Sequence, residues 1–161
     1  MILKRLWLLV LALVSAGLLV AACGQAPAQT KKPVTVNPAA EQNQAAANPF
    51  ANLPKNADGF TDITVAQLAE TLPQKNYTLI NVHIPYAGDL PQTDQSIPFN
   101  EIAKYQDQLP DKDAPLVLYC RSGNMSTQAA QTLVGLGYTN VVEVDGGMVA
   151  WQAAGNQLVD K

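Results

Sequence analysis

The stretch that most constrains the fold is a short apolar run that ends in a cysteine-containing turn. The run Leu116–Tyr119 is followed directly by Cys120 and a glycine-containing loop, and a helical pattern begins at Ser126. Four consecutive apolar residues before such a turn indicate a strand buried on both faces of a sheet. A loop between a strand and a helix N-terminus collects backbone N–H groups that bind anions. We therefore predict that Cys120 lies in an active-site loop and that its thiol ionises readily.

The folded part of the chain alternates helical and strand patterns. After Thr64, which has the character of a helix N-cap, apolar residues recur at helical spacing up to Pro73. The pattern predicts strands over Thr78–His83, Leu116–Tyr119 and Asn140–Val144, an irregular loop over Ile84–Gln95 and a short extended segment over Ser96–Phe99. It predicts helices over Val65–Leu72, Asn100–Leu109 and Ser126–Leu136, and a last helix through Met148 and Trp151 that ends at Gly155. Alternation of this kind indicates a parallel sheet. We expect a single α/β domain over residues 58–161, with a central, mostly parallel sheet and helices on both faces.

The N-terminus has the pattern of a secretion signal. Lys4 and Arg5 precede an apolar stretch over Leu6–Val20, which is short for a membrane-spanning helix but fits the core of a signal peptide. Residues 20–23, ending in Cys23, resemble the lipobox of bacterial lipoproteins, in which the cysteine is acylated and the signal is cut before it. The alternatives are an ordinary secretory signal or an uncleaved anchor. We predict a lipoprotein signal peptide over residues 1–22 and lipidation of Cys23.

The segment over residues 23–57 has the composition of a tether. It is rich in Ala, Gln, Asn and Pro and contains few large apolar side chains. Such a sequence buries too little surface to offset the entropy lost on ordering. We expect a disordered, lipid-anchored linker that holds the following domain at the extracytoplasmic face of the cell membrane.

Charge and cysteine content narrow the function further. The chain has a formal net charge of −3 and no basic cluster, which argues against a nucleic-acid partner. Of its two cysteines, Cys23 is predicted to be lipidated, so Cys120 remains as a free thiol and a structural disulfide is not expected. One histidine, His83, and one usable cysteine do not make a zinc site. We expect a monomer with no metal and no cofactor.

The cysteine loop and the C-terminal part of the chain resemble rhodanese-like sulfurtransferase domains. The resemblance rests on Cys120–Asn124, Gly135–Tyr138, Val141–Met148, Trp151 and Gly155, in that order and spacing, within residues 62–155. It implies that the Cys120 thiolate attacks the outer sulfur of a sulfane donor such as thiosulfate. The enzyme then holds this sulfur as a persulfide and passes it to a thiol or cyanide acceptor.

The resemblance also assigns roles within the loop. It makes Cys120 the nucleophile and Ser126 the start of the supporting helix. The backbone cradle for the persulfide and the departing anion is formed by Arg121, Ser122, Gly123, Asn124 and Met125. Many active members have an arginine where Met125 stands, which puts a preference for thiosulfate in question. Arg121 is then the only basic side chain of the loop, and it either binds an anionic donor or is a surface residue paired with an acid.

The predicted strand at Thr78–His83 departs from the family pattern. Members commonly carry an Asp and an Arg two residues apart there, and this chain has Asn81 and His83. The loop that follows also lacks the usual Gly-His-Ile-Pro-Gly-Ala motif. By topology, His83 should lie near the cysteine loop. It either supports that loop by hydrogen bonding in place of the arginine, modulates Cys120 as a base or cation, or is simply exposed.

The sequence is also compatible with two other functions. The chain can be a catalytically weak binding module of the same fold, in which the altered loop over Ile84–Gln95 contacts a partner. It can also be a phosphatase or arsenate reductase, but related phosphatases carry an arginine six residues after the cysteine, where this chain has Ser126. We expect Trp151 to be a core residue and Asp145 to be a turn residue.

Overall fold

A computed structural model describes residues 48–160, and its centre is a five-stranded sheet in which every paired strand runs parallel. The order across the sheet is β1-β5-β4-β2-β3. The strands are β1 (Thr61–Ile63), β2 (Thr78–Asn81), β3 (Gln95–Ser96), β4 (Leu116–Tyr119) and β5 (Val141–Val144). The helices are α1 (Val65–Thr71), α2 (Asn124–Gly135) and α3 (Gly147–Ala153), with 3₁₀ helices η1 (Leu72–Gln74) and η2 (Phe99–Gln108). The predicted α/β class is confirmed.

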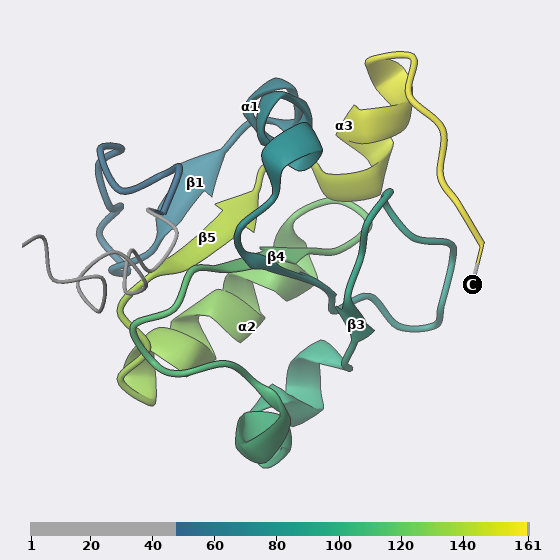
Figure 1. The fold of residues 1–161 in the computed structure, drawn as a ribbon. Helices are drawn as coiled ribbons and strands as arrows, with labels where there is room; N and C mark the ends of the chain where they lie inside the picture. The colour runs from purple at the N-terminus through teal and green to yellow at the C-terminus, as the bar shows by residue number, and fades with distance from the viewer. Residues whose placement is uncertain (1–47, 161) are drawn as a thin grey trace, which may run out of the picture. The chain divides into compact units, whose positions relative to one another are not determined.

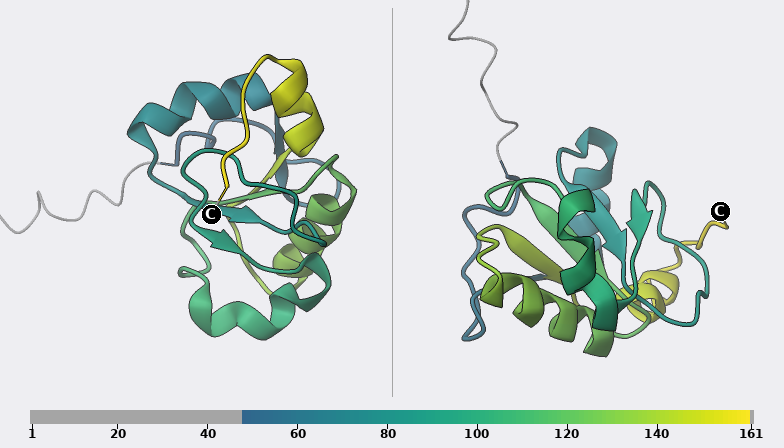
Figure 2. Two further views of the ribbon diagram at one scale, coloured as in Figure 1. Left: turned by 90° about the vertical axis from the view of Figure 1, so that its right-hand side faces the viewer. Right: turned by 90° about the horizontal axis from the view of Figure 1, so that it is seen from below.

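Helices cover both faces of the sheet, α1 and α3 on one side and α2 and η2 on the other (Figures 1 and 2). Alternation along β4 explains this arrangement, because successive side chains of a strand point to opposite faces. Val117 and Tyr119 pack with the cluster that contains Trp151, and Leu118 and Cys120 pack with the cluster on the α2 side. Trp151 is therefore a core residue, as the sequence predicted.

Helix α1 begins where its sequence predicts. The Thr64 hydroxyl accepts from the Gln67 backbone N–H at 3.2 Å, and the Gln67 side chain accepts from the Thr64 N–H at 2.8 Å. This reciprocal capping box satisfies two N–H groups that a helix start otherwise leaves unpaired. It fixes the direction in which the chain leaves β1.

Several element bounds differ from the sequence prediction, and three of these differences have a clear physical reason. Strand β1 was not predicted, because it has only three residues and owes its extended form to pairing with β5. The helix expected from Asn100 is a 3₁₀ helix that Pro98 precedes and that is interrupted at Tyr105, whose φ of −102° and ψ of 15° are not helical. Strand β2 ends at Asn81 rather than at His83, because the chain turns there into the loop that carries Asp89.

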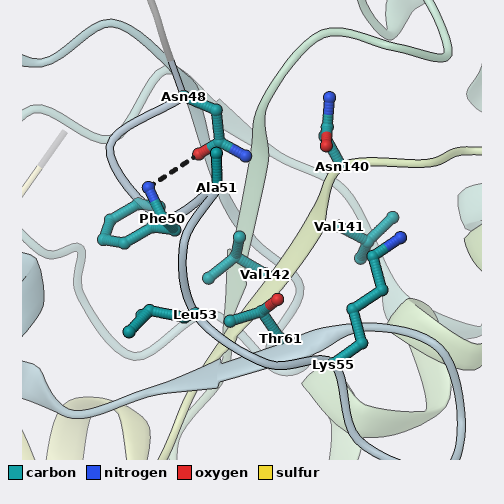
Figure 3. A pocket seen from close by; sticks show the side chains of 9 residues that line it. All are labelled: Asn48, Phe50, Ala51, Leu53, Lys55, Thr61, Asn140, Val141 and Val142. Carbon is teal, nitrogen blue, oxygen red and sulfur yellow. Dashed lines mark hydrogen bonds between the residues drawn. The ribbon is translucent and has the colours of Figure 1, made fainter.

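The packed part of the chain begins before residue 58. Phe50 is 3 % exposed, lies in the core cluster of the α1 side, and has its ring centroid 5.5 Å from that of Tyr77. Its backbone N–H donates to Asn48 Oδ1 at 2.9 Å, at the rim of a pocket beside the start of β5 (Figure 3). Residues 48–57 of the predicted linker thus pack on the domain, and the signal peptide, Cys23 and the rest of the linker lie outside the described residues. Within residues 48–160, no helix has the length and apolar character needed to cross a bilayer.

Candidate active site

Cys120 lies at the carboxyl end of β4, the middle strand of the sheet, and is 1 % exposed. Its Sγ accepts a hydrogen bond from the Gly123 N–H at 3.1 Å. Gly123 is the N-cap of α2 and has a φ of 100°, a left-handed conformation that a glycine adopts without a Cβ clash. The turn therefore aims the positive end of the α2 dipole and a backbone donor at the sulfur, and both favour its anionic form. This is the strand–loop–helix site that the sequence predicted.

The start of α3 holds the cysteine loop from its other side. The N–H groups of Met148 and Val149 donate to the carbonyls of Cys120 and Arg121, each at 3.0 Å. These N–H groups belong to the first turn of α3 and have no partner within their own helix. Gly147 makes the approach possible, because a Cβ placed there would lie 2.1 Å from the Cys120 carbonyl oxygen. The loop carbonyls are thus bound away from the sulfur.

A buried serine and a buried glutamate lie beneath the sulfur. Ser126 and Glu143 are 0 % and 1 % exposed. Ser126 Oγ lies 3.4 Å from Cys120 Sγ and 2.9 Å from the Gly123 carbonyl, and it hydrogen-bonds Glu143 Oε1. Ser126 was predicted to belong to the active-site loop and to start the helix, but α2 begins two residues earlier, at Asn124, because Gly123 is its N-cap. Glu143 was given no role.

The environment of Glu143 favours its neutral form. Burial, and then the nearby carboxylates of Asp145 and Asp62, raise the pKa of its carboxyl to about 7, against the lowering effect of the hydrogen bond from Ser126. The proton is therefore bound more tightly in the folded chain than in the unfolded chain. The stability that this proton gives is complete below the ordinary carboxyl range and is lost as the pH rises through about 7. A glutamate among valines in a strand buried on both faces was the sequence signal for this site.

The other predicted loop residues divide into exposed and packed side chains. Arg121, Ser122 and Asn124 are exposed, and Asn124 Oδ1 accepts from Gln128 Nε2 at 2.8 Å. Met125 packs against the core on the α2 side. Within residues 48–160, Arg121 forms no salt bridge. Its role in binding an anionic donor stays a prediction.

His83 lies close enough to Arg121 for the two side chains to interact electrostatically. Burial, and then the positive charge of Arg121, lower the pKa of the His83 imidazole below its ordinary value of 6.5. The ring is therefore mainly neutral at pH 7, which disfavours the interpretation of His83 as a cation. Its Nδ1 is buried and has no hydrogen-bond partner among residues 48–160. Together with Tyr86 and Ile97, the side chain lines a pocket beside the end of β2.

Asn81 supports the neighbouring loop instead of contacting the sulfur. Its Nδ2 donates to Asp89 Oδ1 at 2.8 Å, and its Oδ1 accepts from the His83 N–H at 2.9 Å. Asp89 is 4 % exposed and also accepts from Tyr119 and Tyr86, each at 3.1 Å. Desolvation raises the pKa of the Tyr119 hydroxyl, so Tyr119 acts as a donor to Asp89. This network was not predicted, because Asp89 lies in a loop without sequence periodicity.

A comparison of the sequence with models of known protein families identifies the family of this chain. The family model for the rhodanese-like domain matches residues 62–154, which include the whole sheet from Asp62 onward, the cysteine loop and α3. The chain belongs to the rhodanese-like domain family.

Individual relatives carry more specific names. Thiosulfate sulfurtransferase GlpE of Pseudoalteromonas translucida (strain TAC 125) is 30 % identical over 105 residues, covering 63 % of this chain and 98 % of the relative. The protein of the same name from Pseudomonas syringae pv. syringae (strain B728a) is 35 % identical over 86 residues, covering 52 % and 80 % of the two chains. Among solved structures, a rhodanese-related protein from Thermoplasma volcanium is 28 % identical with a TM-score of 0.54, covering 63 % of this chain and all of that one.

Proposed function

We propose that this protein is a sulfurtransferase or sulfane-sulfur carrier that forms a persulfide on Cys120. The observation that carries the proposal is the position of Cys120 Sγ, which accepts the Gly123 N–H at 3.1 Å at the N-terminus of α2. Relatives named thiosulfate sulfurtransferase support it. A buried thiol at the base of a short loop suits a small donor with an accessible terminal sulfur.

The proposed reaction has two displacement steps. The Cys120 thiolate attacks the outer sulfur of thiosulfate or a related donor, an Sγ–S bond forms, the S–S bond of the donor breaks, and sulfite leaves with the bonding electron pair. The persulfide keeps one negative charge, which the loop N–H groups and the α2 dipole stabilise. A thiol or cyanide acceptor then attacks the outer sulfur, and the electron pair of the breaking bond returns to Cys120 as thiolate. Arg121, exposed and without an acidic partner in the described part of the chain, orients an anionic donor.

The two alternative functions fit the site less well. A phosphatase of this fold needs a cation where Ser126 stands, and this side chain is buried and bonded to Glu143. A binding module does not require a nucleophile, so it does not explain why a free, buried cysteine accepts a backbone N–H here. The alternative of a binding module is favoured only by Met125 and by the altered loop, which Asn81 and Asp89 hold in place.

Intact-mass spectrometry of the full chain before and after incubation with thiosulfate tests the proposal. We expect the mass to rise by one sulfur atom and to return to its original value after cyanide or a thiol is added. Incubation with sulfate, which has the same charge but no outer sulfur, is the control and should leave the mass unchanged. If neither thiosulfate, polysulfide nor a mercapto acid adds sulfur, the protein is a binding module and the proposal is wrong.

We also propose that the chain is processed at Cys23 and held by lipid at the extracytoplasmic face of the cell membrane. The support is the basic start, the apolar stretch and residues 20–23 of the sequence. Mass spectrometry of the membrane fraction should find a chain that begins at Cys23 and carries acyl groups. The variant Cys23→Ala should lack this modification and retain residues 1–22. A chain cut elsewhere and free of lipid would contradict the lipoprotein interpretation.

A further inference from the structure

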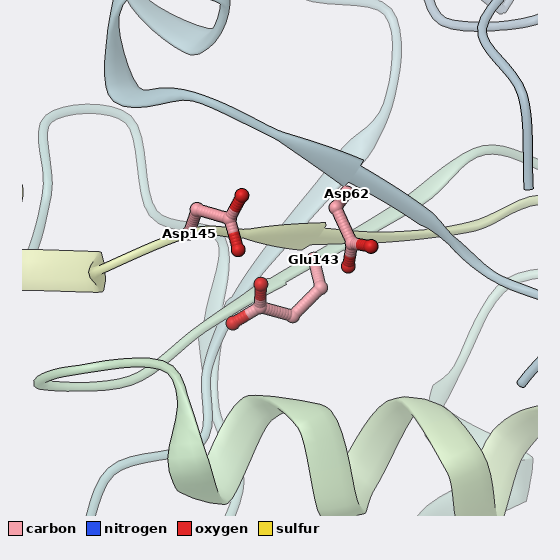
Figure 4. A group of neighbouring side chains, drawn as sticks. All are labelled: Asp62, Glu143 and Asp145. Atoms are coloured by element: carbon pink, nitrogen blue, oxygen red, sulfur yellow. The ribbon is translucent and has the colours of Figure 1, made fainter. Parts of the chain in front are cut away.

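Glu143 is a buried carboxyl group in an otherwise apolar strand, and burial of such a group is costly unless it has a partner. It is 1 % exposed in a strand whose other residues are valines, and its register partners are Asp62 on β1 and Leu118 on β4. Figure 4 shows its carboxyl pointing from β5 toward α2, with Asp62 and Asp145 on either side. Glu143 Oε1 lies only 3.6 Å from the point where a Cβ on Gly123 would be. The carboxyl group therefore lies directly beneath the cysteine loop.

Ser126 connects this carboxyl group to the sulfur. Its Oγ is within hydrogen-bonding distance of Glu143 Oε1 and of Cys120 Sγ. A hydroxyl has one proton to donate and two lone pairs with which to accept. Ser126 can accordingly donate to Glu143 while accepting from the thiol, or donate to the sulfur while accepting from a protonated Glu143.

We propose that Glu143 accepts the proton of the Cys120 thiol, with the Ser126 hydroxyl as the relay between them. The Cys120 S–H proton passes to Ser126 Oγ as the Ser126 O–H proton passes to Glu143, so a thiol and a carboxylate become a thiolate and a carboxylic acid. No net charge is created, and the serine ends as a hydroxyl that donates to the thiolate. Glu143 acts on the sulfur through Ser126 and is a positioning residue. The proposal deepens the proposed sulfur transfer and rests on Cys120 being its nucleophile.

The charges around Glu143 fit a pair of groups that shares one proton. The elements packed against β5 are β1, β4 and α2. They bring Asp62 from β1 and Cys120 from the end of β4, Asp145 follows β5, and α2 contains no charged residue. These elements bring three carboxyl groups and one thiol together and contribute no cation. Ionisation of all four groups at once is therefore disfavoured, because each further negative charge repels the others. Burial raises the pKa of Glu143 to about 7, which brings it near the range in which a cysteine titrates.

The test is a pair of pH titrations followed by NMR, which needs no sulfur donor. The full chain with Cys23→Ala has Cys120 as its only thiol, and a ¹³Cβ label on cysteine reports its ionisation. We expect the Cys120 signal to titrate in two steps, as coupled groups do. In Glu143→Gln the Cys120 signal should titrate in a single step. The midpoint of this step should lie about one pH unit below the upper midpoint of the parent, which raises the ratio of thiolate to thiol roughly tenfold at a given pH. Glu70→Gln, the same change at an exposed position, is the control and should retain both steps.

Two further variants separate a relay from an effect of charge or of folding. In the Ser126→Ala background, the Glu143→Gln change should move the Cys120 midpoint clearly less, because only the repulsion between the charges then remains. In Cys120→Ala, a ¹³C-labelled Glu143 carboxyl should titrate in a single step, without the upper step that its coupling to Cys120 produces, since linkage is reciprocal. This measurement keeps the proposal testable if Glu143→Gln fails to fold.

The outcomes distinguish this inference from the proposed function. An unchanged Cys120 titration in Glu143→Gln, or a shift that persists in full without Ser126, would overturn the relay even if thiosulfate loads sulfur. Coupled titrations in a chain that takes no sulfur from any donor would leave the relay standing and refute the proposed function.

Discussion

Replacing Cys120 with serine is expected to lower the rate of sulfur transfer by at least about a thousandfold, to the uncatalysed background. The serine hydroxyl fits the space of the thiol and accepts the Gly123 N–H. It remains un-ionised at neutral pH, and it cannot hold a second sulfur as a persulfide. The fold should remain intact, with a change in the free energy of unfolding of about 1 kcal/mol or less, because the change is nearly isosteric.

Steady-state transfer from thiosulfate to cyanide and urea unfolding, measured on the same preparations, check this prediction. The chain supplies its own control, because Cys23→Ser changes the second cysteine, which has no role in the proposed reaction. That variant should transfer sulfur at the parent rate in solution. Residual transfer by Cys120→Ser above about one thousandth of the parent rate, or loss of its cooperative unfolding, would contradict the assignment.

The part of the site that comes from one continuous stretch was predictable from the sequence. The apolar run Leu116–Tyr119, the turn at Gly123 and the helical pattern after it place Cys120 at a strand end and a helix start, and β4 and α2 confirm this local structure. Local patterns were sufficient because each of these features is set by neighbours in the chain. The alternation of strands and helices likewise predicted the parallel sheet.

The parts that depend on distant residues were not predictable. Glu143 lies beside Ser126 and Asp62 only because β5 lies between β1 and β4. The order of strands in a sheet cannot be predicted from any single segment of the sequence. Phe50 packs on Tyr77 from a stretch whose composition indicates a linker, because one aromatic side chain can anchor an otherwise polar segment. Strand β1 exists through its pairing with β5 and has too few residues to show a pattern.

Asn81, which stands where this family commonly has an acid, takes part in a hydrogen-bond network that supports the neighbouring loop. Where relatives of this family commonly have an Asp and an Arg, Asn81 binds Asp89 from the following loop, and Asp89 binds Tyr119 of the strand that delivers Cys120. His83, mainly neutral at pH 7 because its pKa is lowered, does not replace the positive charge of an arginine. Arg121 is the basic side chain of the cysteine loop, and in the proposed reaction it is the group that orients an anionic donor.

The second large effect is expected at Gly147, where α3 meets the cysteine loop. The variant Gly147→Ala places a Cβ 2.1 Å from the Cys120 carbonyl oxygen and 2.9 Å from its carbon, and these are backbone atoms that cannot rotate away. The φ of +49° adds the strain of a left-handed alanine. Overpacking and backbone strain together should lower the free energy of unfolding by about 2–4 kcal/mol. The displaced loop should lower the rate of sulfur transfer by about a hundredfold, as misplacement by about an ångström does.

Gly155→Ala is the matched control for this prediction. Gly155 also has a positive φ, +85°, but a Cβ there meets nothing within 4 Å. Its replacement should therefore cost only the backbone strain, about 1–2 kcal/mol, and leave the rate of transfer unchanged. Urea unfolding and transfer kinetics on both variants separate strain from loop displacement. Equal transfer rates in the two variants would show that α3 does not set the position of Cys120, because only Gly147→Ala pushes against the carbonyl of the nucleophile.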